Sequence, residues 1–354
     1  MVRRRRAGRL RGNPPVRPDR KPSKRRKGAR RIRRTKTYEQ PPGHPNPKHG
    51  SVKGRHPATQ KLRAAIQDGT PKYRYRTLRH GNGTWKEGCP PQNTGQDTGT
   101  EAYTKVWNSA KAEIALRRIL KDTGAKAFTT NFNDLGDFDQ IPGLASQRLM
   151  EEGYGFGAEG EWKTAALYRT TWFMSQGMPK GCSFLEDYTL HFDGEKSAIL
   201  QAHMLEVCPL IAEAKPKLEV HRLSIGIGSE TARLVFSSKQ GEGVAATIVD
   251  LGNRFRLIVN KVECIKSKPL PKLPVASALW IPMPNLEVGA AAWILAGGTH
   301  HTSFSYDLTV EYWEDYAEMA GIEMVVIDEN TTISEFKKEL RMNEVYYMLN
   351  KALC

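Results

Sequence analysis

The sequence predicts a protein of mixed class, in which helices come first and a mainly β region follows, behind a basic N-terminal segment. Residues 1–100 contain 28 Lys and Arg but only 5 Asp and Glu, a net charge of +23, together with 12 of the 21 prolines. After Thr104, apolar residues recur at three- and four-residue steps, which is typical of an amphipathic helix. Beyond Gly181, short runs rich in Val, Ile and Phe alternate with turn residues, which indicates strands.

The N-terminal segment, residues 1–103, is expected to be disordered or non-native. Its first 100 residues contain only 8 Val, Leu or Ile, too few to offset the conformational entropy of folding. We interpret the segment as an out-of-frame or chimeric translation of the upstream part of the gene, because Arg, Pro, Gly and Thr are enriched without any hydrophobic period. The alternatives are a solvated extension without function and a nucleic-acid-binding arm, which would bind phosphates in a salt-dependent way. Few aromatic residues and no recognisable binding motif argue against the arm.

The remainder of the chain predicts helices, then strands, then helices again. Helices are expected over residues 104–123, 142–152, 162–178, 309–319 and 335–349, the last capped by Ser334. Strands are expected over residues 220–225, 232–236, 243–251, 255–262 and 323–328. The first four of these strands suggest an antiparallel, barrel-like sheet. The most apolar run, residues 288–298, is about half the length that spans a bilayer and is expected to be a buried core element.

Cysteine usage and the absence of a signal peptide predict a cytoplasmic protein. The five cysteines are scattered without paired spacing, and no charged start is followed by an apolar centre of useful length. We expect no membrane association.

Three stretches differ from ordinary scaffold. Glu159 stands among four glycines, Glu186 belongs to an acidic pair with aromatic neighbours, and His301 ends a Gly-Gly-Thr-His-His turn. Each has an ordinary interpretation too, because acids in loops are usually solvated, and a single His such as His203 is more often a satisfied core residue than a ligand. The positions lie far apart in the chain, so their spacing alone does not join them into a metal motif.

Longer segments of the chain follow one another in a characteristic order between about residue 110 and residue 347, namely GYGFGAEGEWKTAALYR, SFLEDYTLHF, AHMLEVCPLIA, IVDLGNRFRLIVN, LPKLPVASALW, WILAGGTHHTSFSY and LRMNEVYY. These segments and their order resemble bacterial L-arabinose isomerase. The resemblance implies a fold that begins with a partial central α/β domain at residues 104–180. A β-rich C-terminal isomerase domain with flanking helices would follow at residues 181–350.

The resemblance also implies a site and a reaction. The family's metal ligands correspond to Glu159, Glu186, His203 and His301, and its sugar-contacting positions correspond to Phe132 and His300. Two carboxylates and two imidazoles suit one Mn²⁺ ion with positions left for substrate oxygens. The implied reaction converts L-arabinose to L-ribulose through an enediolate, with the two glutamates as acid and base. The family further implies a homo-oligomer.

A second function of another class is a basic nucleic-acid-binding protein that uses the isomerase-like part as an inactive scaffold. DNA or RNA binding at two salt concentrations, with and without residues 1–100, distinguishes this function from the enzyme.

Overall fold

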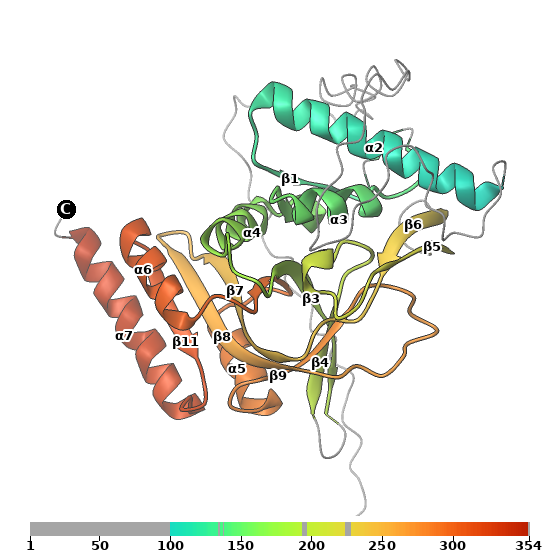
Figure 1. Cartoon of the computed structure of the whole chain (residues 1–354). Coiled ribbons are helices and arrows are strands. Elements are labelled where there is room, and N and C mark those ends of the chain that lie inside the picture. Colours follow the sequence, from blue (N-terminus) through green and yellow to red (C-terminus); the bar gives the residue numbers. More distant parts are fainter. Residues whose placement is uncertain (1–99, 134, 137, 193–196, 224–227, 353–354) are drawn as a thin grey trace, which may run out of the picture. The chain divides into compact units, whose positions relative to one another are not determined.

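The computed structural model describes residues 100–133, 135–136, 138–192, 197–223 and 228–352, all within one compact unit. The α/β class is confirmed, with helices and a small sheet first and a large mixed sheet after them (Figure 1). The prediction of a disordered segment over residues 1–103 was wrong for residues 101–103, which are helical. For residues 1–99, this prediction and the alternatives for the basic segment lie outside the described residues. The division between domains at residue 180 stays a prediction.

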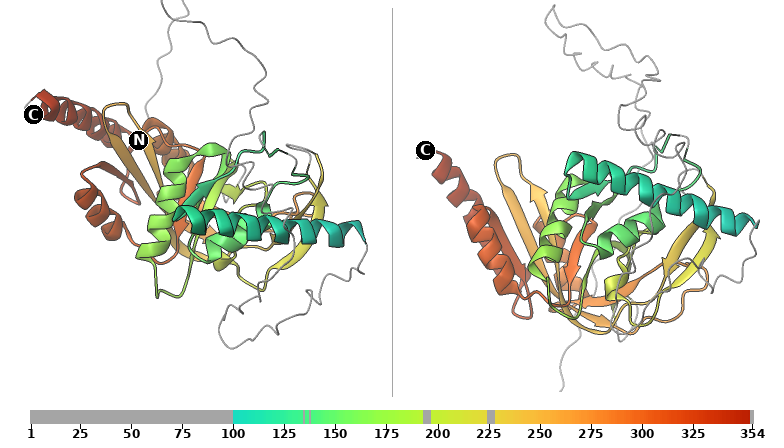
Figure 2. Two further views of the ribbon diagram at one scale, coloured as in Figure 1. Left: turned by 90° about the horizontal axis from the view of Figure 1, so that it is seen from above. Right: turned by 45° about the horizontal axis from the view of Figure 1, so that its top comes forward.

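The first described helix, α2 (Glu101–Thr123), confirms the predicted helix but begins three residues earlier. Thr100 caps it, because its side-chain oxygen accepts a hydrogen bond of 3.2 Å from the Tyr103 N–H. Gly124 ends it in the left-handed conformation, with φ of 68°. Helix α2 packs against α3 (Gly143–Glu151), which is followed in the chain by α4 (Trp162–Met174) (Figure 2). The helices expected over residues 142–152 and 162–178 are therefore confirmed.

A two-stranded parallel sheet lies among these helices. It pairs β1 (Ala127–Thr129) with β2 (Gly155–Gly157), and the Phe128 and Phe156 rings contact each other with centroids 5.4 Å apart. Each strand has three residues, too short to show a hydrophobic period, so the sequence did not predict them. The short 3₁₀ turn η1 (Ala158–Gly160) follows β2 directly.

The large sheet has seven strands in the order β11-β8-β7-β10-β3-β4-β9, and β8 pairs with β9 as well. Their bounds are β3 (Cys182–His191), β4 (Ala198–Ala202), β7 (Gly241–Asp250), β8 (Phe255–Ile265), β9 (Ala278–Pro282), β10 (His301–Ser305) and β11 (Glu323–Ile327). The four strands predicted to form one antiparallel sheet are divided between two sheets. Those predicted at residues 220–225 and 232–236 correspond to a separate antiparallel hairpin, whereas those at 243–251 and 255–262 pair antiparallel as β7 and β8. The large sheet is mixed, because β11 runs parallel to β8. The reason is that α6 (Val310–Ala320) connects β10 to β11 as a crossover, so the two strands run in the same direction. The barrel-like form stays a prediction.

A separate hairpin, β5 (Lys217–Arg222) with β6 (Glu230–Val235), lies beyond the second 3₁₀ turn, η2 (Pro209–Ile211). The Gln147 side chain of α3 forms hydrogen bonds with the backbone of β6, in the way a neighbouring strand would. Its amide oxygen accepts from the Leu234 N–H at 2.8 Å, and its amide nitrogen donates to the Leu234 carbonyl at 3.1 Å. A side chain thus satisfies the backbone of an edge strand.

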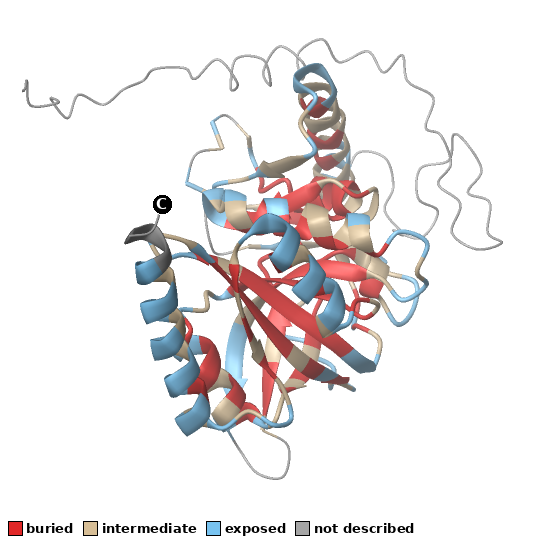
Figure 3. Ribbon diagram, turned by 90° about the vertical axis from the view of Figure 1, so that its left-hand side faces the viewer, coloured by how far each residue is buried: buried red, intermediate tan, exposed pale blue. Residues whose placement is uncertain are grey.

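The C-terminal helices flank the large sheet. They are α5 (Leu286–Leu295), α6 and α7 (Ile333–Ala352), and Figure 3 shows the outer face of α7 exposed while the strands of the large sheet are mostly buried. The apolar run was predicted to be buried, but only part of α5 is: Ala292 is fully buried, whereas Ile294 is 70% exposed. Thr332, not the predicted Ser334, accepts a hydrogen bond from the Glu335 N–H at the start of α7. No helix among the described residues is long and apolar enough to cross a membrane.

Candidate metal centre

Sheet register brings three distant segments of the chain to one place. Glu186 on β3 pairs directly with His301 on β10 and, on its other side, with Ala202 at the end of β4. His203 follows Ala202 in the chain. Side chains of directly paired residues lie on the same face of a sheet, so Glu186 and His301 face the same side. The structure therefore joins residues that are up to 115 positions apart in sequence.

The His203 imidazole is buried and held by a carboxylate. The residue is 2% exposed, and its Nδ1 lies 2.6 Å from Oε2 of Glu206, which is itself buried. The same carboxylate oxygen accepts from the Leu205 N–H at 3.1 Å, so its orientation is fixed as well. Burial alone would lower the pKa of His203, but Glu206 and then Glu186 raise it overall. Nε2 faces Glu186, with 3.8 Å to its Oε2.

His301 is held in the same way by a second carboxylate. Its Nδ1 lies 3.0 Å from Oε2 of Glu161, and its Nε2 is buried with no hydrogen-bond partner among the described residues. Burial would raise the pKa of Glu161, but hydrogen bonds from His301 and Thr164 lower it overall. A Cβ at Gly157 would lie 2.1 Å from the Glu161 carbonyl oxygen, so only glycine permits this close turn.

The Phe184 ring, which belongs to a hydrophobic core cluster, contacts both buried imidazoles. Its centroid lies 5.2 Å from the His203 ring and 5.1 Å from the His301 ring, and the two imidazole rings are 5.6 Å apart. Phe184 is fully buried. A buried aromatic ring in contact with both imidazoles limits their rotation and excludes water from the contacting faces.

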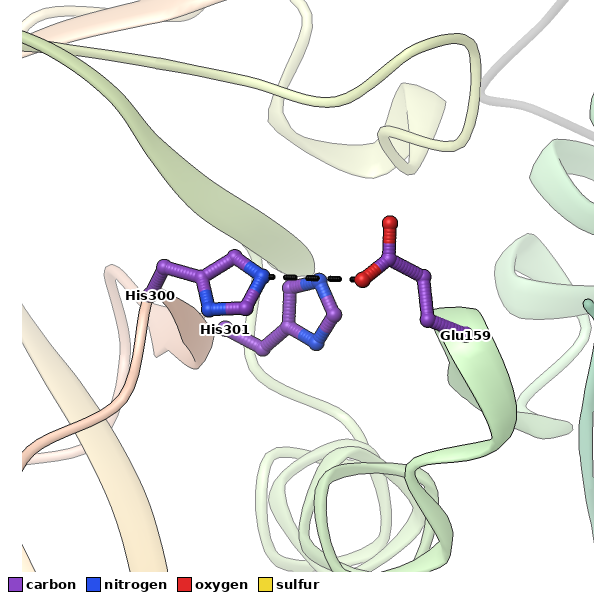
Figure 4. A group of neighbouring side chains, drawn as sticks. All are labelled: Glu159, His300 and His301. Atoms are coloured by element: carbon purple, nitrogen blue, oxygen red, sulfur yellow. Dashed lines mark ion pairs between the residues drawn. The ribbon is translucent and has the colours of Figure 1, made fainter. Parts of the chain in front are cut away.

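Glu159 and His300 form the exposed side of the site (Figure 4). The Glu159 Oε2 lies 3.7 Å from Nε2 of His300, and the side chains are 37% and 52% exposed. One ligand atom each from Glu159, His300 and His301 lie within 4.8 Å of one another. Glu159 has φ of 59°, the one positive value among the described residues other than glycine. Such strain occurs mostly where a function requires a side chain to point in an unusual direction.

The turn that carries the two histidines is fixed by its neighbours. Trp293 of α5 donates its indole N–H to the Thr299 carbonyl at 2.9 Å, and the Thr299 hydroxyl donates to the His301 carbonyl at 3.2 Å. The Asp187 N–H donates to the His300 carbonyl at 2.9 Å, which extends the contact between β3 and β10 by one residue. Hydrogen bonds therefore hold the backbone at His300 in place, although its imidazole is exposed.

Glu186 completes the group. Its side chain is 21% exposed, and burial is the main cause that raises its pKa, with the charge of Glu159 acting in the same direction. His203 and His300 oppose this rise. A carboxylate whose pKa lies above its ordinary value takes up and releases a proton more readily near neutral pH.

The predicted residues do not all lie together. Glu159, His300 and His301 form the compact group, and Glu186 with His203 lies beside them. Phe132, predicted to contact a sugar, is half-buried against the hydrophobic cluster that contains Met204 and Leu205.

Sequence reasoning missed Glu161 and Glu206, the two carboxylates that hold the imidazoles. The only signal in the sequence was closeness to a predicted ligand: Glu161 stands two residues after Glu159, and Glu206 stands three residues after His203. Only the fold shows which ring nitrogen each one contacts.

The donor set fits a divalent metal ion. Both buried imidazoles use Nδ1 for a carboxylate, which leaves Nε2 as the ligand atom, and the unpartnered Nε2 of His301 is a buried polar atom that otherwise carries a desolvation cost. Carboxylates facing such nitrogens are typical of hard or borderline cations. The class that the fold and the site define is thus an α/β protein with a group of carboxylates and imidazoles that could hold a metal ion.

Comparison with known proteins names the family. Residues 92–177 match the L-arabinose isomerase central domain, and residues 181–323 match the L-arabinose isomerase C-terminal domain. The chain belongs to the L-arabinose isomerase family through this part. It is 79% identical over 265 residues to the L-arabinose isomerase of Phocaeicola vulgatus, which covers 73% of the chain and 52% of the relative. The corresponding protein of Thermotoga petrophila is 58% identical over 247 residues, covering 70% of the chain and 50% of that relative. The chain thus spans about half the length of the curated relatives it matches.

Proposed function

We propose that this chain binds one Mn²⁺ ion through Glu159, Glu186, His203 and His301, and that the site isomerises L-arabinose to L-ribulose. The observation that carries the proposal is the buried Nε2 of His301, which lacks a hydrogen-bond partner among the described residues and lies beside Glu159. Binding a cation would stabilise this nitrogen strongly, because no other partner offsets the free energy lost when its water was removed.

The protein's own groups supply the acid–base chemistry. The pKa of Glu186 is raised, and the Glu159 side chain is exposed to solvent. We assign these two carboxylates to the transfer of a proton between C1 and C2 of the open-chain sugar, one as base and the other as acid. A bound divalent ion would polarise the sugar carbonyl. His300, which is exposed beside Glu159, would donate a hydrogen bond to a sugar hydroxyl.

The substrate is inferred from the relatives, which are named L-arabinose isomerases. Since the chain matches only half of their length, turnover is proposed for the site and depends on how much of the sugar-binding surface lies in this half. A homo-oligomer and a cytoplasmic location remain part of the proposal; the buried, unpaired thiols of Cys182, Cys208 and Cys264 are compatible with a reducing compartment.

Calorimetric titration of the chain with MnCl₂, followed by an assay for ribulose formation, tests the proposal. We expect heat of binding from MnCl₂ and none from Mn²⁺ that has first been saturated with EDTA. We also expect turnover that Glu186→Gln removes. A Glu242→Gln variant, which changes an exposed carboxylate at the start of β7, is the matched control. Absence of binding heat in the unaltered chain would contradict the metal site, and unchanged turnover in Glu186→Gln would contradict the assigned role.

A further inference from the structure

A buried ionic cluster adjoins the end of α5. Arg256, near the start of β8, pairs directly with Glu323, the first residue of β11, and their side chains are 7% and 1% exposed. Nη2 of Arg256 lies 2.9 Å from Oε1 of Glu323 as an ion pair, without the direction of a hydrogen bond. Nε of Arg254 donates to the other carboxylate oxygen, Oε2. One carboxylate thus lies between two guanidinium groups.

Arg256 also reaches the last turn of α5. Its Nη1 donates a hydrogen bond of 2.8 Å to the carbonyl oxygen of Ala296, the C-cap of that helix. The last carbonyl groups of a helix lack a partner within it and carry the negative end of the helix dipole, so a guanidinium stabilises them. The Arg256 side chain therefore connects β11 with the residue at which the turn to His300 and His301 begins.

The position of this turn depends on the end of α5. Only four residues separate Ala296 from His301, and a Cβ at Gly298 would lie 2.3 Å from the indole nitrogen of Trp293. The same indole N–H donates to the Thr299 carbonyl. Because α5 carries Trp293 and ends at Ala296, a shift of the helix end would move both the start of the turn and the donor that holds its middle.

On its other side, the cluster is held by α7. Nη2 of Arg254 lies 2.9 Å from Oε2 of Glu344, and the guanidinium carbon lies 5.0 Å from the centroid of the Tyr347 ring. Phe336 of α7 also belongs to the hydrophobic cluster that contains Ala296. The match to the C-terminal domain of the family ends at residue 323, so α7 lies beyond it. Contacts therefore run from α7 through the ionic cluster to the end of α5.

We propose that Arg256 is a positioning residue for His300 and His301, because it holds the end of α5 while Glu323 and α7 hold its guanidinium. This inference deepens the proposed function and rests on it for the role of His301 as a ligand. Stability alone explains the cluster less well, because the desolvation of buried charges offsets much of their attraction. Nε of Arg256 is moreover buried without a hydrogen-bond partner among the described residues, which costs free energy.

Hydrogen exchange of the metal-free protein tests the positioning. Arg256→Met removes the donor to Ala296 and keeps an unbranched side chain at the buried position. Exchange in the peptide covering residues 296–302 should become about tenfold faster, the change expected when one hydrogen bond from a charged group is lost. Arg148→Met is the matched control, because Arg148 pairs with the buried Glu113 at 2.6 Å on other elements of the fold. It should lower the midpoint of urea denaturation and leave exchange in this peptide unchanged.

A second variant decides the question if Arg256→Met does not fold. Arg256→Lys keeps the charge beside Glu323 but replaces the two arms of the guanidinium with a single ammonium group, so exchange should be intermediate. The inference is overturned if either Arg256 variant exchanges as the unaltered chain does. It is equally overturned if Arg148→Met accelerates exchange in residues 296–302 to the same extent.

Calorimetric titration with MnCl₂ separates this inference from the proposed function. Mn²⁺ affinity should fall about tenfold in Arg256→Met, the lower end of the range for residues that orient a ligand, and should not change in Arg148→Met. Faster exchange with unaltered Mn²⁺ affinity would overturn the role of Arg256 toward the histidines. Absence of binding in the unaltered chain would contradict the metal site, whereas exchange in the metal-free protein still decides whether Arg256 positions the turn.

Discussion

The two sides of the candidate metal centre are built differently. On the buried side, His203 and His301 are each 2% exposed, and each has its Nδ1 within 3.0 Å of a carboxylate oxygen. On the exposed side, Glu159 and His300 share only a 3.7 Å ion pair. The fold thus orients the imidazoles before any ligand arrives, whereas the exposed pair can adjust to one.

Burial explains the difference. A buried imidazole nitrogen has lost its water and needs another partner, and the fold supplies one to each Nδ1 through Glu206 and Glu161. Exposed groups are satisfied by solvent and need no such partner. The comparison therefore predicts large effects on metal binding from changes on the buried side and a small one from the loss of the exposed His300.

The largest expected effect is that of His301→Ala, which removes the unpartnered Nε2. Mn²⁺ binding should fall below detection in calorimetry, because a direct ligand is lost from a site that the fold has already formed. His191→Ala, which removes an exposed imidazole at the end of β3, should bind as the unaltered chain does. Equal loss in both variants would mean that binding is not specific to this centre.

The next effect is that of Glu206→Gln, which keeps the shape of the side chain but removes the charge that orients His203. Mn²⁺ affinity should fall about 10- to 100-fold, as for other carboxylates that hold a ligating imidazole. Glu213→Gln, an exposed change nearby, is the control. A nitrogen NMR spectrum of His203 should show a changed tautomer balance; an unaltered balance together with unaltered affinity would remove the positioning role.

A smaller effect is expected for His300→Ala. Exposed ion pairs contribute about 0–1 kcal/mol, so Mn²⁺ affinity should fall by about fivefold at most. The measurement is the same titration, repeated at 0.5 M NaCl, where the difference should shrink through screening. A loss as large as that of His301→Ala would make His300 a direct ligand and end the distinction between the two sides.

The smallest effect concerns stability. Glu159→Gly should raise the free energy of unfolding by about 0.5–1 kcal/mol, because glycine adopts positive φ without the steric cost that Glu159 carries. Urea denaturation without metal measures it. Glu213→Gly, at an exposed position with negative φ, should not stabilise the protein. If Glu159→Gly destabilises it, the backbone there is not strained.

Strong local signals were read correctly from the sequence. The helix α2 was predicted from apolar residues that recur at three- and four-residue steps and from Gly124 at its end, but its start at Thr100 was placed three residues too late. The three-residue strands β1 and β2 carry no such period, and their pairing depends on contacts across 28 residues of chain. The direction of β11 likewise depends on the path of α6 over the sheet and on no residue within β11.

For the site, the amino-acid sequence was sufficient to name the candidate ligands, since Glu159, Glu186, His203 and His301 stand in segments that resemble one family. It did not indicate that Glu161 and Glu206 hold the imidazoles, nor that Nε2 of His301 is left without a partner. Those facts depend on strand register and burial, which arise from contacts between distant segments. A residue type is a local property, whereas the orientation and solvation of its side chain belong to the folded neighbourhood.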